Sequence, residues 1–140
     1  MATITVDGLE ELMNDLKAVS EIPDSVANEM LDRQSDIVIK AQKSRISSIG
    51  LVDSGQLMRS IQKDGGMKKR AGTRSVEISP VGTRTNGVRN AEVGFIHEYG
   101  AKGKHIPAKN WMQQANESCA DKAVEAAREV YDEFLKSKNL

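Results

Sequence analysis

The 140-residue chain is long enough for one domain, spanning residues 1–140, that buries about 70% of the surface its unfolded chain exposes. Its single cysteine, Cys119, excludes an internal disulfide and a cysteine-based zinc site. No apolar run reaches the ~18 residues that a membrane-spanning helix needs, and the opening MATITVDGLEEL lacks an apolar signal region. We therefore expect a cytoplasmic protein with no membrane partner.

Charge is distributed unevenly along a chain that is neutral as a whole. Residues 1–39 hold two basic and nine acidic side chains, residues 40–89 hold eleven and three, and residues 90–140 hold seven and eight. This pattern fits complementary surfaces on identical subunits that pack head to tail. It fits equally well the neutralisation of neighbouring faces within one molecule, and the sequence leaves both interpretations open.

The first third of the chain predicts one strand and two helices. The β-branched segment 2–6 favours a strand, and apolar residues spaced by three and four predict a short amphipathic helix over 9–19. A long helix is expected from Pro23 to about Ser47. The polar segment 32–36 interrupts its apolar stripe, so we expect that helix to be exposed over much of its circumference.

The middle of the chain is rich in glycine and basic residues. A break at 50–55 precedes QLMRSI (56–61), which predicts one helical turn leading into a strand. Residues 62–74 are typical of a mobile loop or a hairpin tip.

Two further strands are predicted at 75–81 and 91–96. A basic loop, residues 82–90, joins them; it contains the turn pair Asn86–Gly87 but is longer than a tight hairpin needs. Such a loop often carries function and orders when it meets a partner.

The last element is a long helix. Asn110 is expected to cap it, with Gln113 three residues later as in a capping box. Its apolar stripe, about six turns long, consists of Met112, Ala115, Cys119, Ala123, Ala127, Val130 and Phe134. The element order predicts an α+β domain with a small, mostly antiparallel sheet packed against long helices.

The adjacent pair His97–Glu98, at the end of the predicted 91–96 strand, is the obvious catalytic candidate. Neighbouring side chains on a strand point to opposite faces, so the two would not share one cleft. His105 is close in sequence, but no nucleophile elbow or metal-spaced cluster accompanies it. We favour a structural or interface role over a small hydrolase, and we predict no catalytic residue, metal or cofactor.

Other residues with reactive or binding chemistry have simpler explanations. Cys119 lies on the apolar stripe and is expected to fill the core. Trp111 is expected to anchor the preceding loop to the core, with interface exposure as the alternative. The basic residues Lys68, Lys69, Arg70, Arg74, Arg84 and Arg89 could contact nucleic acid, but no aromatic residues are interleaved among them for base stacking. A nucleic-acid-binding module that uses residues 62–89 is therefore the alternative function.

Three short motifs resemble one protein family. SGQLMRSI (54–61) resembles a (T/S)-G-x-L-x-x-S-I signature, EYG (98–100) resembles E-(F/Y)-G-T, and IPAKNW (106–111) resembles M-P-A-R-P-F before a C-terminal helix. In this order they resemble the minor tail-component family of long-tailed double-stranded DNA phages and prophages. Ala101 departs from the threonine of the pattern, and Lys109–Asn110 depart from Arg–Pro.

The resemblance implies a structural virion protein at the head–tail junction, a tail-completion or neck protein without enzyme activity or cofactor. It implies a ring, hexameric to match the tail, between connector or head-completion proteins and the tail tube or tail terminator. DNA would meet the protein only as it passes through the ring. Assembly would occur in the host bacterial cytoplasm, and whether the free protein is a monomer stays open. The expected interface or motif residues are Ser54, Gly55, Leu57, Lys68, Lys69, Arg70, Arg84, Arg89, Glu98, Tyr99, Gly100, Pro107 and Trp111.

Overall fold

The computed structural model describes residues 10, 12, 13, 22–51 and 55–138. The predicted strand 2–6 and most of the predicted helix 9–19 lie outside these residues. Ser54 of the first motif also lies outside them.

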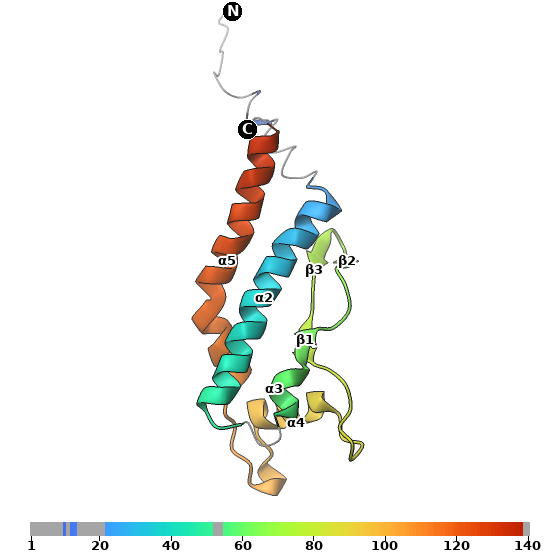
Figure 1. The fold of residues 1–140 in the computed structure, drawn as a ribbon, viewed down its shortest axis with the longest axis vertical. Helices are drawn as coiled ribbons and strands as arrows, with labels where there is room; N and C mark the ends of the chain where they lie inside the picture. The colour runs from blue at the N-terminus through green and yellow to red at the C-terminus, as the bar shows by residue number, and fades with distance from the viewer. Residues whose placement is uncertain (1–9, 11, 14–21, 52–54, 139–140) are drawn as a thin grey trace, which may run out of the picture.

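Two long helices, α2 (Asp24–Ser48) and α5 (Trp111–Ser137), run antiparallel along the length of the molecule (Figure 1). They form the largest interface between elements. Ala27 of α2 and the three alanines 115, 123 and 127 of α5 are buried along it. Small side chains let two helix backbones approach closely, so the alanine-rich stripe of α5 determines how this pair packs.

The apolar stripe predicted for α5 is confirmed. Six of its seven members are buried, including Cys119, which fills the core as expected. The difference is at the first turn, where Trp111 is fully buried and Met112 only partly buried. The stripe therefore begins one residue earlier than the spacing indicated.

The prediction of a long second helix is also confirmed, and only four of its 25 residues, Ala27, Ser35, Gln42 and Ile46, are buried. Within 32–36 only Asp36 is exposed, and Ser35 is buried, where its hydroxyl donates to the Leu31 carbonyl at 2.7 Å. The helix is covered by α5 on one side and by strands on another, so a polar residue with a local acceptor is buried at little cost. At its end Gly50 has φ +79°, and Leu51 N–H donates to the Ile46 carbonyl at 3.0 Å, as in a Schellman motif.

The strands form two small antiparallel pairs. A single helical turn, α3 (Gln56–Ser60), leads into β1 (Ile61–Lys63), as predicted, and β1 pairs with β4 (Ile78–Pro80). The second pair, β2 (Lys68–Arg70) and β3 (Thr73–Ser75), is a hairpin that begins within the predicted 62–74 loop and ends one residue beyond it. The predicted strand 75–81 is shorter than expected, since only Ser75 and 78–80 are in strands.

The predicted strand at 91–96 is wrong, because residues 90–99 form a helix, α4 (Asn90–Tyr99). Its buried face consists of Asn90, Gly94 and Glu98, spaced by four. None of these residues is apolar in the usual sense, so the helical period was invisible to a hydrophobicity pattern. Glycine is usually unfavourable inside a helix, but the close packing around Gly94 requires it. A Cβ at this position would lie 2.9 Å from Pro80 Cγ and 3.3 Å from Trp111 Cζ2.

The hydrophobic core lies at the end of the molecule where α3 and α4 pack against the long helices (Figure 1). Its fully buried members are Ile46, Leu57, Ile61 and Trp111. These elements confirm the α+β class with a small antiparallel strand set and a long C-terminal helix. None of the helices in the described part of the chain is long and apolar enough to cross a membrane.

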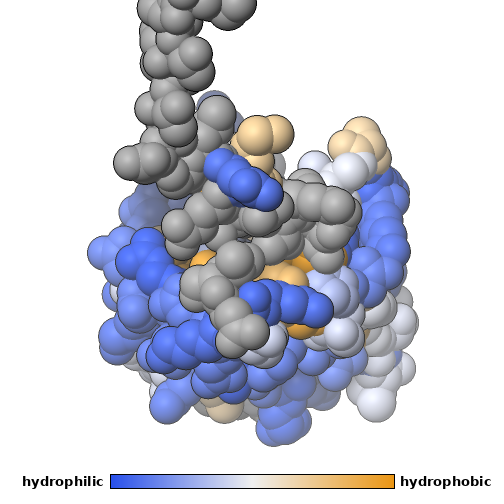
Figure 2. Space-filling view, turned by 90° about the horizontal axis from the view of Figure 1, so that it is seen from above, coloured by the Kyte–Doolittle hydropathy of each residue, from blue (hydrophilic) through white to orange (hydrophobic). Residues whose placement is uncertain are grey.

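The opposite end holds an apolar groove of about 280 Å³ between α2, α5 and the β2–β3 hairpin. Met30, Leu31 and Ala127 are among its lining residues. Viewed from above, the coloured surface of this end is mostly hydrophilic, with hydrophobic residues visible near its middle (Figure 2).

Candidate interface at the α4 end

Glu98 is the N-terminal cap of α5, although it belongs to another helix. Its carboxylate accepts the backbone N–H groups of Met112 at 2.5 Å and Gln113 at 3.1 Å, and the residue is only 4% exposed. A carboxylate at a helix N-terminus accepts hydrogen bonds from the free backbone N–H groups and interacts favourably with the positive end of the helix dipole. Asn110 stands at the N-cap position of α5 as expected, but it has φ +49° and its side chain makes no capping hydrogen bond, so the predicted capping interaction is wrong.

The three motif segments meet at this end of the molecule. Trp111 Nε1 donates to the Gly94 carbonyl at 3.0 Å, which ties the start of α5 to α4. The same glycine faces Leu57 of α3, whose Cδ1 lies 3.4 Å from the Cβ that Gly94 lacks. Trp111 is thus a core anchor rather than an exposed interface residue, and Leu57 is core as well.

Gly100, one of the expected motif residues, occupies a turn with unusual backbone geometry. Its φ of +79° and ψ of 173° belong to a region open almost only to glycine. A Cβ there would lie 2.8 Å from the Ala108 nitrogen and 2.9 Å from the Ile106 carbonyl oxygen. Residues 101 and 106 pair as an isolated antiparallel bridge around the short helix η1 (Lys102–Lys104). The turn therefore returns the chain directly along the end of α4.

His97 and Glu98 diverge, for a different reason than the sequence indicated. On a helix they are about 100° apart rather than on opposite faces of a strand. Glu98 turns towards α5, whereas His97 faces Lys109, whose Nζ lies 3.4 Å from His97 Nδ1. Burial lowers the pKa of His97 below its usual value, and the charges of Lys109 and Arg84 lower it further.

His105 does not join His97. It lies exposed after η1 with φ +53°, and no hydrogen bond connects the two rings among the described residues. The described residues also hold no group of three or more histidine, cysteine or acidic side chains placed to bind a metal ion.

The outer face of α4 exposes a pair of aromatic residues, of which the sequence predicted only Tyr99. Tyr99, an expected interface residue, is 73% exposed, and Phe95 is 42% exposed. Their rings stack with centroids 6.2 Å apart and an interplanar angle of 24°. The spacing of four would have identified Phe95 had the segment been interpreted as a helix.

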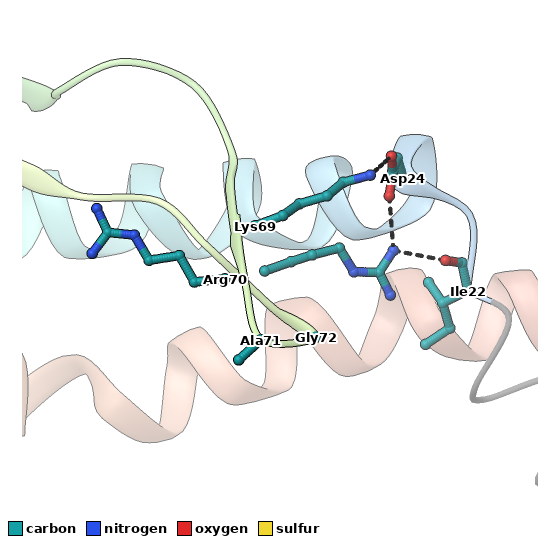
Figure 3. A pocket seen from close by; sticks show the side chains of 7 residues that line it. Ile22, Asp24, Lys69, Arg70, Ala71 and Gly72 are labelled. Atoms are coloured by element: carbon teal, nitrogen blue, oxygen red, sulfur yellow. Dashed lines mark hydrogen bonds and ion pairs between the residues drawn. The ribbon is translucent and has the colours of Figure 1, made fainter.

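The basic hairpin is tied to acidic residues of its own chain. Lys69 and Arg74 both contact the Asp24 carboxylate at the start of α2, and Arg74 also donates to the Ile22 carbonyl at 2.7 Å (Figure 3). Lys68 pairs with Glu77 at 2.9 Å. Hydrogen bonding to Lys69, more than the contact with Arg74, lowers the pKa of Asp24. Lys68 likewise lowers the pKa of Glu77.

These contacts bear on the uneven charge of the sequence. Asp24 with its two partners, and Lys63 with Asp32 at 2.5 Å, join the acidic first third to the basic middle. Neutralisation within one molecule therefore accounts for part of the segregation. Arg70 is exposed and points away from Asp24 (Figure 3).

The remaining predicted residues are scattered over the same end. Arg89 pairs with Glu92 at 3.0 Å, and Pro107 is exposed in the segment that precedes α5. Arg84 Nε donates to Asn90 Oδ1 at 3.1 Å. Gly55 is the buried residue before α3, with φ +77°.

Comparison with known proteins adds no relative to this picture. No family model, no curated protein and no solved structure matches the chain.

Proposed function

We propose that this protein is a structural component of a phage or prophage virion, a tail-completion or neck protein at the head–tail junction. The observation that carries the proposal is the meeting of the three motif segments at one end of the fold. There the motif residues Leu57 and Trp111 build the core, and Glu98 caps α5. A set of residues with linked structural roles gives these motifs a reason to occur together.

The exposed surface of the same end supports a role in assembly. The stacked Phe95 and Tyr99 lie on the outer face of α4, next to the turn at Gly100. Large exposed aromatic side chains are common at the centre of protein–protein interfaces. In this proposal they contact the neighbouring subunit of a ring that lies between the connector and the tail tube.

The direct test is deletion of the gene in the phage or prophage that carries it. We expect filled heads and separate tails by electron microscopy, and normally joined virions would contradict the proposal. Complementation with a Phe95→Ala/Tyr99→Ala variant should fail to restore joining. Val124→Ala is the matched control, because Val124 is a similarly exposed apolar residue on α5.

The nucleic-acid alternative has less support in the geometry. Lys68, Lys69 and Arg74 are engaged with Glu77 and Asp24, which reduces the positive charge that the hairpin offers to phosphates. Binding of DNA or RNA with an affinity that falls steeply with salt would favour this alternative. Absence of binding at low salt would remove it.

A further inference from the structure

A small cavity lies between α4, the end of α2 and the loop that precedes α4. It has a volume of about 250 Å³ and is lined by Gly50, Leu51, Leu57, Arg84, Val93 and His97. Three of these residues, Leu51, Leu57 and Val93, are apolar, and Arg84 and His97 are basic. Lys109 adds a third basic group, because its ammonium contacts His97 at 3.4 Å.

These basic groups have no acidic counterpart among the described residues. No carboxylate there lies within ion-pair distance of Arg84, His97 or Lys109. The two acidic residues of α4 are already engaged, Glu92 with Arg89 and Glu98 with the start of α5. Like charges gathered at a partly buried site repel each other unless an anion compensates them.

The cluster is held in place by neighbouring hydrogen bonds. Arg84 Nε donates to Asn90 Oδ1, and the buried Asn90 donates in turn to the Val81 carbonyl at 2.9 Å. The Lys109 backbone N–H donates to the His97 carbonyl at 2.8 Å. Groups fixed before the ligand arrives lose little conformational freedom on binding it.

We propose that this cavity is a carboxylate-binding site in which Arg84 and Lys109 pair with the carboxylate oxygens. The terminal nitrogens of an arginine match a carboxylate in two-pronged geometry. The apolar wall formed by Leu51, Leu57 and Val93 contacts the hydrocarbon stem that carries the carboxylate. A fully hydrated inorganic anion gains nothing from such a wall.

Two sources can supply this chemistry. One is a small free carboxylate, and the other is an acidic side chain on a second copy of the chain. On α5, Asp121, Asp132 and Glu133 are exposed and form no ion pair with any described residue. The inference concerns the free chain and does not depend on the proposed virion role, so either can fail without the other.

The experiment uses the two histidines of the chain as reporters. Histidine ring resonances are followed by NMR while glutarate is added at constant ionic strength, with sodium phosphate and sodium chloride as comparison anions. We expect a saturable shift of His97 with glutarate and a rise in its pKa, since a bound carboxylate favours the imidazolium. His105 should respond little.

Three variants test the residues. Arg84→Gln and Lys109→Gln should each weaken glutarate binding by about tenfold, the loss expected for one charge-assisted hydrogen bond. Arg89→Gln is the matched control, because Arg89 lies in the same loop but pairs with Glu92, and it should bind as the wild type does. If Arg84→Gln fails to fold, Lys109→Gln still tests the proposal, because among the described residues the Lys109 side chain makes no hydrogen bond or ion pair except its contact with His97.

Several outcomes would overturn the proposal. These are an unchanged His97, equal linear shifts of both histidines, stronger binding of phosphate than of glutarate, or displacement of glutarate by a short DNA duplex. The source follows from a dilution series without glutarate. A concentration-dependent His97 shift, with self-association in sedimentation velocity that glutarate reverses, supports the second copy as donor. A shift that depends on glutarate alone supports a free carboxylate.

Discussion

Removal of the Glu98 carboxylate is expected to destabilise the whole fold, although Glu98 lies on a ten-residue helix. Glu98 accepts the first free N–H groups of α5, at Met112 and Gln113, and α5 forms the largest interface of the molecule with α2. Glu98→Ala leaves both donors without an acceptor at a site from which water is largely excluded. Glu98→Gln keeps the shape and one acceptor oxygen but removes the charge.

The magnitudes follow from the two hydrogen bonds. An unsatisfied buried donor costs roughly 1–3 kcal/mol, and loss of a helix cap costs about 1 kcal/mol. We expect Glu98→Ala to lower the free energy of unfolding by about 3 kcal/mol. Glu98→Gln should lower it by about 1.5 kcal/mol, from lost charge assistance and dipole compensation. Since domains of this kind are stable by about 5–15 kcal/mol, both changes are large.

Urea denaturation followed by circular dichroism measures these changes directly. The midpoint should fall while the m-value stays constant, and the Tm of Glu98→Ala should fall by roughly 10 °C. Glu92→Ala is the matched control: this carboxylate is on the same helix, exposed and paired with Arg89, so its loss should cost less than about 0.5 kcal/mol. A Glu98→Ala variant as stable as the control would refute the capping argument.

Three further predictions concern the turn, the core and the hairpin. Gly100→Ala should lower the free energy of unfolding by about 2–3 kcal/mol in urea titrations, since its φ is positive and its Cβ would meet backbone atoms at 2.8–2.9 Å. Gly103→Ala, with nothing within 4 Å, should change it little, and equal effects would contradict the argument. Trp111 is the single tryptophan, so the folded protein should fluoresce at short wavelength, and emission typical of exposed tryptophan would count against its burial. Trp111→Phe should lower the free energy of unfolding by about 1–2 kcal/mol, because it removes a hydrogen bond and leaves unfilled volume. Because its basic partners lower the pKa of Asp24 from 3.8, this residue should contribute stability above about pH 4 that is lost as pH falls through the lowered value. Asp24→Asn should flatten acid denaturation in that range, and an unchanged pH profile would argue against these ion pairs.

The candidate site could be predicted only in part. Gly100 was expected as part of the EYG motif (98–100), and its positive φ is the structural reason for a glycine there. The cluster of Arg84, His97 and Lys109 gave no sequence signal, because three separate segments bring these residues together. The role of Glu98 was equally hidden, since its partners lie fourteen and fifteen residues further along the chain.

The fold divides in the same way. By itself the sequence determined the long helices, because the 27-residue α5 repeats apolar residues at helical spacing and α2 carries no competing pattern. It also determined the α3 turn and the C-terminal stripe, where burial follows hydrophobicity.

Only the tertiary structure decided the conformation of residues 90–99. Their alternating apolar residues favoured a strand, yet the buried positions are Asn90, Gly94 and Glu98. Each of these residues forms a hydrogen bond with a residue outside α4: Asn90 with Val81, Gly94 with Trp111, and Glu98 with the start of α5. This helix is stabilised by hydrogen bonds and close backbone packing rather than by the burial of apolar side chains. The residues of its buried face therefore show no apolar repeat at helical spacing.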